Sequence, residues 1–444
     1  MNKETEDLLN RGVGEFIDPG GIFREKLEKN PEKIVIKFGI DPTRPDIHLG
    51  HAVLLRKLRQ FQDLGAKVVF VVGDYTAQIG DPTGKSKVRP AIDQAEVERN
   101  MATFIEQIGK ILRTDKNVFS WIRNSDWFTA ITDISAPMGQ KLKMTLPSGQ
   151  TVDDIDANSF VGKALIFTET RMQIKDLGLK EDISVITLQS FLWMLKHVTH
   201  AKLIERDLFQ ERIKNQQDLY LHEMMYPILQ GIDSLVLSRI YKSCDLEIGG
   251  TDQHFNMLMG RTVMRVNNEV EQSVLSLKLL EGIDGKEKMS KSLDNYIAIT
   301  DKHGDMYGKV MSIPDSSIGN YFELTTFTPM DEVENIRKGL SNKSIHPKEI
   351  KMDLARQIVA IYHGERAAEE AEKNFTETFS KGGVPADIKT VKMSKDTPLV
   401  EILLEQGLVS SKTEFNRLTK SGAIKEMANG VYRIGKHRFL KIER

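Results

Sequence analysis

The sequence predicts an α/β protein built around a parallel sheet, and three observations lead to this fold class. Two runs of apolar and β-branched residues, at 33–38 and 66–73, have the composition of strands that are covered on both faces. Between them, residues 47–64 carry apolar side chains at helical spacing. A strand, a helix and a second strand in this order form a right-handed crossover, which joins neighbouring parallel strands.

The loop that links the first strand to this helix is a candidate phosphate-binding site. Two prolines end the strand, and Asp46 is expected to cap the helix. The first turn then contains His48, Gly50 and His51, close to the free N–H groups and the positive end of the helix dipole. The histidines can donate to phosphate, and the glycine lets a base or ribose approach the backbone. Histidines at a helix start are also common as capping or surface residues, so this site needs support from other parts of the chain.

Length and composition exclude several classes of protein. The 444 residues are enough for about three domains, and 62 Lys and Arg nearly balance 63 Asp and Glu, so any nucleic-acid-binding surface must be local. Cys244 is the only cysteine, which excludes a disulfide framework and a Cys-based zinc site and fits a reducing compartment. The sequence has no apolar signal core at its start and no run of transmembrane length. We expect a cytoplasmic protein without a structural metal ion.

The loop after the second strand offers a candidate ligand-binding carboxylate. It contains I-G-D-P-T-G-K-S, but three residues separate Gly80 from Gly84 where a Walker A loop has four. Asp81 in this loop follows the carboxyl end of a parallel strand, where such sheets bind ligands. An aspartate before a proline is equally typical of a plain turn. Downstream, the pattern predicts an amphipathic helix at 94–112 and a short strand at 118–122.

A helical region at 188–241 contains a polar stripe. Tyr226, Gln230 and Asp233 stand at positions i, i+4 and i+7 and therefore share one face of a helix. Pro227 is tolerated in a first turn or at a kink, so we expect the helix to begin near it. The leucines around the stripe make it a candidate pocket floor. The spacing alone is equally typical of a solvated stripe on a surface helix.

A glycine pair at the end of another predicted strand is a second place where a ligand could approach the backbone. The strand at 245–248 ends in Gly249 and Gly250, which Asp252 and Gln253 follow closely. Asp252 is placed to accept hydrogen bonds from ribose hydroxyls. A plain glycine turn with a solvated aspartate describes these residues equally well when they are taken alone.

The segment 285–292, G-K-E-K-M-S-K-S, predicts a flexible loop. Lys288 and Lys291 stand three residues apart in it and can bring mobile positive charge to a phosphate leaving group. A similar K-M-S-K at 392–395 lies in a linker marked by glycine and proline, with no glycine-rich strand end before it. We interpret this second copy as coincidence.

The remaining parts of the chain carry weaker signals. Residues 1–32 are expected to form a polar helical lead-in, residues 128–185 have no assignable chemistry, and residues 326–380 are helical and charged. Residues 398–444 predict a compact unit of helices followed by strands. This unit has nine basic and five acidic residues, a local excess that indicates RNA contact. An ordinary solvated face would have a similar composition.

Four motifs now stand in one order along the chain. They are H-L-G-H after the first strand, G-D-P-T-G-K after the second, Y-x-x-x-Q-x-x-D ahead of G-G-T-D-Q, and K-M-S-K-S. Together they resemble the motifs of class I aminoacyl-tRNA synthetases, and specifically of the tyrosyl-tRNA synthetase family. The longer phrases Y-P-I-L-Q-G-I-D-S and L-L-E-G-I-D-G-K-E-K-M-S-K-S-L carry the same resemblance. It covers residues 30–125 and 200–325, and residues 398–444 resemble the S4-type RNA-binding module of many members.

The resemblance implies a domain organisation with a catalytic domain first and an RNA-binding module last. In chain order, the expected parts are a Rossmann-like catalytic domain of the HUP type (1–325) with an insertion (about 125–225) and the K-M-S-K-S loop (285–295), an α-helical anticodon-side domain (326–380), a linker (381–397) and a small α+β S4-like module (398–444).

The resemblance also implies a reaction and the residues that carry it. Members of the family activate L-tyrosine with ATP and Mg²⁺ to tyrosyl-adenylate and transfer tyrosine to the end of tRNA(Tyr), as homodimers away from membranes. The implied tyrosine-binding residues are Asp81, Tyr226, Gln230, Asp233 and Gln253. The implied ATP-binding residues are Asp41, Thr43, His48, Gly50, His51, Asp252, Lys288 and Lys291. Those implied to be catalytic are His48, His51, Gln253, Lys288 and Lys291, and the supporting residues are Lys37, Gly39, Lys85, Arg89, Gly249 and Gly250.

The sequence departs from the family pattern at two positions, and two alternative functions remain to be tested. Lys37 stands where many members have a tyrosine, and Glu247 replaces a common glutamine. One alternative is the sister tryptophanyl enzyme, against which Asp233 and the basic terminal module argue. The other is an inactive relative retained as an RNA-binding scaffold, against which the intact H-L-G-H and K-M-S-K-S motifs argue.

Overall fold

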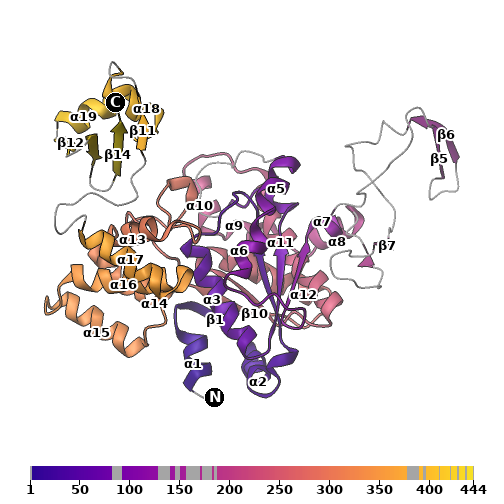
Figure 1. The fold of residues 1–444 in the computed structure, drawn as a ribbon. Coiled ribbons are helices and arrows are strands. Elements are labelled where there is room, and N and C mark those ends of the chain that lie inside the picture. The colour runs from indigo at the N-terminus through magenta and orange to yellow at the C-terminus, as the bar shows by residue number, and fades with distance from the viewer. Residues whose placement is uncertain are drawn as a thin grey trace. The chain divides into compact units, whose positions relative to one another are not determined.

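The described part of the chain forms two compact units in the computed structural model (Figure 1). The first consists of Met1–Leu280 and Met289–Lys291, and the second consists of Glu281–Lys288 and Ser292–Arg444. Within these units, the structure describes residues 3–82, 93–128, 141–145, 151–156, 171–172, 183–184, 188–377, 390–393, 397–409, 411–420, 422–427, 430–435 and 438–443.

The first unit is built on a sheet with the strand order β1-β10-β9-β2-β3-β4. Its strands are β1 (Val13–Ile17), β2 (Val35–Ile40), β3 (Lys67–Val72), β4 (Phe119–Arg123), β9 (Leu246–Gly250) and β10 (Ser273–Leu277). Neighbouring strands are parallel except β1, which runs antiparallel to β10. The predicted α/β fold with a parallel sheet is therefore confirmed. The helical lead-in expected at 1–32 contains helices at Lys3–Asn10 and Ile22–Lys29, but the prediction is wrong for the segment between them, which is β1. β1 is a partly exposed edge strand and lacks the apolar run by which buried strands are recognised.

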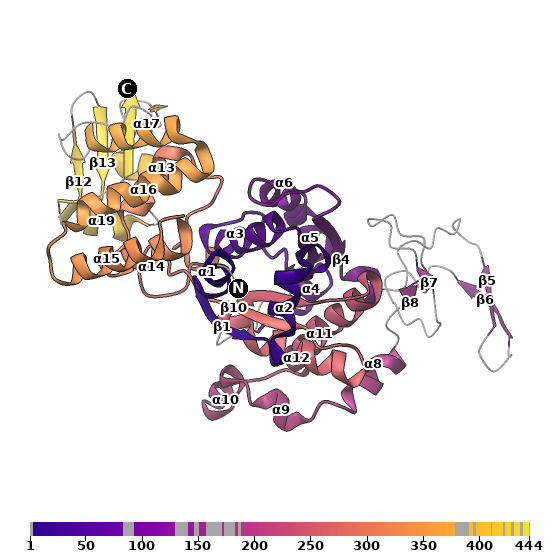
Figure 2. The same ribbon diagram turned by 90° about the horizontal axis from the view of Figure 1, so that it is seen from below.

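Helices cover both faces of this sheet (Figure 2). The helix predicted at 94–112 is two separate helices, α5 and α6. The helix of the polar stripe, α11, begins at Leu221, where the Glu223 side chain accepts a hydrogen bond from the Tyr220 N–H at 3.1 Å. Pro227 lies inside α11, so the expected start near Pro227 is wrong. The helices of this unit are α1 (Lys3–Asn10), α2 (Ile22–Lys29), α3 (Leu49–Asp63), α4 (Thr76–Ile79), α5 (Gln94–Met101), α6 (Phe104–Gly109), α7 (Ser125–Phe128), α8 (Leu188–Leu195), α9 (His200–Ile204), α10 (Asp207–Lys214), α11 (Leu221–Tyr241) and α12 (His254–Val266).

Short strand pairs and turns complete the first unit. Between β4 and α8, β5 (Lys141–Thr145) pairs with β6 (Thr151–Asp156), and β7 (Arg171–Met172) pairs with β8 (Ile183–Ser184). Both pairs fall in the region to which the sequence assigns no chemistry. Single 3-10 turns lie at Pro19–Gly21, Pro31–Lys33 and Thr251–Gln253.

α11 is buried along most of its length and packs against the sheet and α12. Its apolar residues Ile228, Ile232 and Leu235 belong to one cluster with Val69 of β3 and Val263 of α12. Burial of this kind stabilises by about 1.5–3 kcal/mol for each large apolar side chain. The packing therefore holds the polar stripe of α11 at a defined position on the sheet.

The second unit combines helices with a small sheet of order β11-β14-β13-β12. Ile402 and Leu403 pack with Ile434 and Leu440 in an apolar cluster of its terminal part. β11 lies within 381–397, the range expected as a linker, and pairs in parallel with β14. The elements are α13 (His303–Met311), α14 (Ile318–Thr325), α15 (Met330–Ser341), α16 (Pro347–His363), α17 (Glu365–Phe375), β11 (Thr390–Lys392), α18 (Leu399–Glu405), α19 (Lys412–Lys420), β12 (Ile424–Glu426), β13 (Val431–Ile434) and β14 (Arg438–Glu443).

We expect Gly231→Ala to destabilise the first unit by about 1–3 kcal/mol. A Cβ at this position would lie 2.7 Å from Val263 Cγ2 and 3.2 Å from the Met259 carbonyl oxygen, so α11 and α12 would have to move apart. Gly308→Ala in α13 is the matched control, because a Cβ there meets no atom within 4 Å and alanine favours a helix. Denaturant unfolding followed by circular dichroism compares the two variants. Equal stability would contradict the close packing of α11 on α12.

Candidate active site

The carboxyl ends of β2, β3 and β9 carry many of the predicted site residues. These strands are neighbours and run parallel, so their carboxyl ends meet at one edge of the sheet, where α/β proteins bind ligands. Asp41 follows β2, Asp81 follows β3 and α4, and Gly249 and Gly250 end β9. α11 contacts both β2 and α4 and brings its polar stripe to the same edge.

Asp41 connects the loop after β2 to α4 and α11. Its Oδ2 accepts a hydrogen bond from the Tyr226 hydroxyl at 2.8 Å, and its Oδ1 accepts one from Thr76 Oγ1 at 2.8 Å. The carboxylate lies against Gly73, where any Cβ would collide with it. The N–H of Thr43 closes the loop by donating to the Asp41 carbonyl oxygen at 2.8 Å. The predicted Asp41 and Tyr226 are thus brought together, with Thr76 and Gly73 as partners that the motifs did not reveal.

Asp233 is a buried carboxyl on α11 with an indole partner. Its Oδ1 accepts a hydrogen bond from Trp127 Nε1 at 3.0 Å. Burial raises the pKa of Asp233 to about 7, although the positive charge of Lys37 and hydrogen bonds from Trp127 and Asn124 act to lower it. A carboxyl whose pKa lies near neutrality can exchange hydrogen bonds with a substrate hydroxyl, and such groups cluster at functional sites.

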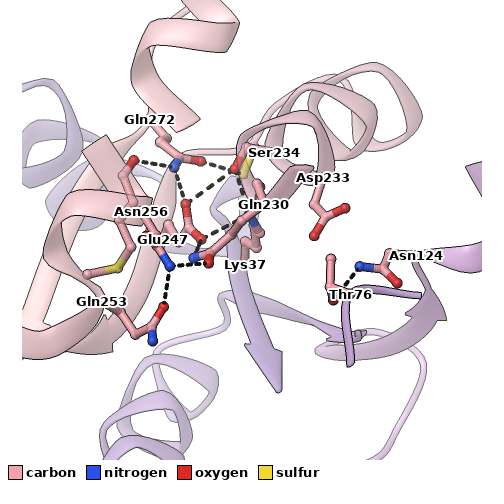
Figure 3. A network of polar contacts seen from close by, with 12 residues as sticks. Lys37, Thr76, Asn124, Gln230, Asp233, Ser234, Glu247, Gln253, Asn256 and Gln272 are labelled. Atoms are coloured by element: carbon pink, nitrogen blue, oxygen red, sulfur yellow. Dashed lines mark hydrogen bonds and ion pairs between the residues drawn. The ribbon is translucent and has the colours of Figure 1, made fainter. Parts of the chain in front are cut away.

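A buried ion pair lies beside the polar stripe (Figure 3). Lys37 Nζ is 2.9 Å from Glu247 Oε1 and also donates to the Gln230 carbonyl oxygen at 2.7 Å and to Ser234 Oγ at 2.8 Å. Glu247 accepts further hydrogen bonds from Gln230 Nε2 at 3.0 Å, from Ser234 Oγ at 3.3 Å and from Gln272 Nε2. The two positions at which the sequence departs from the family pattern therefore contact each other.

A chain of amides runs from this pair through Gln230 and Asn256 to Gln253 (Figure 3). Asn256 Nδ2 donates to Gln230 Oε1 at 3.1 Å and to Gln253 Oε1 at 3.0 Å. Gln253 Nε2 in turn donates to Asp81 Oδ2 at 2.7 Å. Arg206 approaches the other oxygen of Asp81 at 3.8 Å. The predicted residues Gln230, Gln253 and Asp81 thus belong to one hydrogen-bonded network.

The predicted histidines lie at the start of α3, which has His48 and not Asp46 at its N-cap. The His48 N–H donates to His51 Nδ1 at 3.4 Å, and the two rings lie with centroids 3.8 Å apart. A Cβ on Gly50 would come within 3.0 Å of the His48 ring, so a larger residue would displace the histidine. The carbonyl oxygen of Asp46 instead accepts a hydrogen bond from Lys291 Nζ, and burial lowers the pKa of Lys291 to about 8.

The other predicted residues lie in β2, in the turn after β9, in the second unit or outside the described residues. Gly39 lies in β2. Asp252 lies in the turn after β9, and its Oδ1 would be 2.6 Å from a Cβ added to Gly250. Lys288 belongs to the second unit, in which it forms a β-bridge with Glu281. Two of the supporting residues, Lys85 and Arg89, fall outside the described residues.

This combination of fold and motifs agrees with a comparison with protein families. The model of the family described as tRNA synthetases class I (W and Y) matches residues 29–140 and 171–380. The chain belongs to this family. Two curated relatives match this synthetase over nearly its whole length. The tyrosine–tRNA ligase of Francisella tularensis is 35% identical and the tyrosine–tRNA ligase 2 of Clostridium acetobutylicum is 39% identical, each over 99% of this chain and 98% of the relative.

Two solved structures with a similar fold are tyrosyl-tRNA synthetases. A C-terminally truncated mitochondrial enzyme from Aspergillus nidulans has a TM-score of 0.57 at 18% identity and covers 85% of this synthetase and 95% of its own chain. An Archaeoglobus fulgidus enzyme complexed with L-tyrosine has a TM-score of 0.53 at 16% identity, and the match covers 83% of this synthetase and 100% of the Archaeoglobus chain. At these identities the likeness supports the Rossmann-like fold.

Several polar partners in the synthetase were missed by motif reasoning. Ser234 stands four residues after Gln230, and Asn256 stands three after Gln253, so helical spacing from a predicted residue could have identified both. Trp127, Arg206 and Gln272 come from segments far from any motif, and the sequence holds no signal that points to them.

The described residues contain neither a metal-binding cluster nor a membrane-spanning helix. Among those residues, no group of three or more His, Cys, Asp or Glu side chains is arranged to hold a metal ion. Within the same part of the synthetase, the helices are all too short or too polar to cross a membrane.

The buried carboxyl of Asp233 should make the stability of the synthetase depend on pH. Below about pH 4 this group is protonated in both the folded and the unfolded chain. Between about pH 4 and pH 7 only the unfolded chain releases the proton, because burial raises the pKa of Asp233 to about 7. The wild type should therefore lose about 2–4 kcal/mol of stability relative to Asp233→Asn as the pH rises through this range.

Denaturant unfolding at several pH values measures this difference. Asp7→Asn, at an exposed position of α1, is the control and should run parallel to the wild type. A pH-independent difference between Asp233→Asn and the wild type would show that Asp233 does not titrate in this range.

Proposed function

We propose that this synthetase is specific for tyrosine: it activates L-tyrosine with ATP and then transfers the tyrosyl group to tRNA(Tyr). The observation that carries the proposal is the buried carboxyl of Asp233, which lies on the polar stripe of α11 beside the Trp127 indole. A hydroxyl at the end of an aromatic side chain is a matched hydrogen-bond partner for such a carboxyl. The names of the two full-length relatives, both tyrosine–tRNA ligases, support the same substrate.

The amino-acid end of tyrosine would meet a group of hydrogen-bond acceptors. Asp81, Tyr226 and Gln230 offer oxygen atoms suited to an ammonium group, and Gln253 would lie near the reacting carboxylate. Phenylalanine would fill the same space but leave Asp233 without a hydroxyl partner. An unsatisfied buried polar group costs about 1–3 kcal/mol, so tyrosine is preferred.

The reaction would proceed by two displacements. A carboxylate oxygen of tyrosine attacks the α-phosphorus of ATP, which carries Mg²⁺ as part of the substrate, and the bond to pyrophosphate breaks. A ribose hydroxyl at the end of the tRNA then attacks the carbonyl carbon of tyrosyl-adenylate, and AMP leaves. Neither step needs a protein nucleophile, so the side chains act by positioning the substrates and stabilising charge.

The nucleotide would lie along the N-terminus of α3. His48 and His51 would meet the phosphates, Gly50 the adenosine and Asp252 the ribose hydroxyls. Lys291 and Lys288 would neutralise the leaving pyrophosphate. The supporting residues around this site are Lys37, Gly39, Asp41, Thr43, Lys85, Arg89, Gly249 and Gly250.

The proposal includes a macromolecular partner and an assembly. Residues 398–444, with nine basic and five acidic side chains, would form an S4-like contact with tRNA(Tyr). Residues 326–380 would lie on the anticodon side. A homodimer in the cytoplasm completes the proposal, because this is the arrangement expected of tyrosyl enzymes.

Exchange of pyrophosphate into ATP, measured with each of the twenty amino acids, tests the proposed substrate. We expect exchange with tyrosine alone, because only tyrosine carries a hydroxyl that Asp233 can bind at the end of an aromatic ring. Exchange with tryptophan would identify the sister tryptophanyl activity. No exchange with any amino acid would favour a role as an RNA-binding scaffold.

Lys291→Ala should slow the exchange reaction by about 10²-fold with little change in tyrosine binding, because Lys291 would stabilise charge that develops on pyrophosphate. Lys286→Ala, an exposed lysine of the same segment, is the matched control and should retain the wild-type rate. Pre-steady-state measurement of adenylate formation separates the two effects. A variant that binds tyrosine weakly but reacts at the normal rate would contradict the role of Lys291.

A further inference from the structure

The ion pair between Lys37 and Glu247 is fully enclosed by protein. The side chains are 1% and 3% exposed, and the two residues lie opposite each other on the neighbouring strands β2 and β9. Burying two charges is costly unless each has good partners. Here each N–H of the Lys37 ammonium has an acceptor, and Glu247 accepts from Lys37, Gln230, Ser234 and Gln272. Both charged groups of the pair are therefore supplied with hydrogen-bond partners.

The charge of Glu247 sets the direction of the hydrogen bonds that extend from it. A carboxylate only accepts, so Gln230 must turn its Nε2 toward Glu247 and its Oε1 away. Asn256 Nδ2 then donates to this Oε1 and to Gln253 Oε1, which directs Gln253 Nε2 to the Asp81 carboxylate. Without a charge at one end, an amide can present either its oxygen or its nitrogen. Figure 3 shows the whole chain from Lys37 and Glu247 to Gln253.

We propose that the Lys37–Glu247 pair is a positioning device that makes the amino-acid pocket select an ammonium group; this inference rests on the proposed function. With the pair present, Gln230 presents its oxygen and Gln253 holds Asp81 in place, so the pocket offers acceptors to a cationic amine. With both charges removed, Asp81 still orients Gln253 at the far end of the chain, but Gln230 loses the carboxylate that fixes its Nε2, so its amide can reverse and present N–H groups, which oppose a cation. The pair acts through Gln230, Gln253 and Asp81 and needs no contact with the substrate.

The experiment compares three ligands that differ only at the amino-acid end. L-Tyrosine carries both the ammonium and the carboxylate, tyramine carries the ammonium alone, and 3-(4-hydroxyphenyl)propanoate carries the carboxylate alone. The variant Lys37→Met/Glu247→Gln removes both charges with little change of shape and leaves no unpaired buried charge. Calorimetric titration of the full-length protein gives the Kd of each ligand.

For this variant we expect the Kd of tyrosine and the Kd of tyramine to rise about 10-fold, which corresponds to about 1.4 kcal/mol of binding free energy. The Kd of the propanoate and the KM for ATP should stay within about twofold of the wild-type values. Arg212→Met/Glu223→Gln is the matched control. It removes an equally buried pair, with side chains 3% exposed and atoms 2.7 Å apart, which lies outside the amide chain. The control should change none of the ratios between the three ligands.

A second variant keeps the inference testable if the double variant fails to fold. Asn256→Ala interrupts the amide chain in its middle and leaves the ion pair intact, so it should show the same ammonium-specific loss. Equal weakening of all three ligands in either variant, or no weakening at all, would overturn the inference. Absence of tyrosine binding by the unaltered protein would instead contradict the proposed function.

Discussion

The polar stripe of α11 is the constraint on which the rest of the site depends. A helix that buries Tyr226 and Asp233 and partly buries Gln230 in its packed face must supply each of them with a partner, because an unsatisfied buried polar group costs about 1–3 kcal/mol. The partners come from distant parts of the chain: Asp41 accepts a hydrogen bond from the Tyr226 hydroxyl, and Trp127 donates one to Asp233. The hydrogen bonds that the polar side chains of α11 require therefore also bring the residues of the candidate site together.

The distribution of charge in the first unit follows from the same constraint. Lys37 and Glu247 neutralise each other in the interior, and Arg206 lies close to Asp81 with the rings of Phe209 and Phe255 on its guanidinium. Among the described residues, none forms a direct ion pair with Asp233, and burial raises the pKa of its carboxyl to about 7. The proposed tyrosine pocket thus combines a carboxyl that can bind a hydroxyl with oxygen atoms that suit an amine, which is the pattern that a tyrosine substrate requires.

Sequence patterns predicted the central elements well and their edges less well. Runs of apolar and β-branched residues predict the buried strands β2 and β3, whereas β1 is a partly exposed edge strand whose sequence does not distinguish it from a helical lead-in. The sequence predicts that α11 starts near Pro227, but the hydrogen bond from the Tyr220 N–H to Glu223 marks an earlier start, and the proline lies inside the packed helix. In the same way, Asp46 is a good capping residue by type, yet His48 holds the N-cap of α3.

By itself, the sequence determined the parallel α/β fold, the order of the four motifs and the family resemblance, because these depend on local composition and spacing. Only the tertiary structure decided that Lys37 faces Glu247, that Trp127 reaches Asp233 and that Asn256 joins Gln230 to Gln253. These contacts join residues on different strands and helices, and their geometry depends on strand register and helix packing. Neither strand register nor helix packing can be read from the residue spacing of one segment. The hydrogen-bond network of the site is therefore known only from the folded structure.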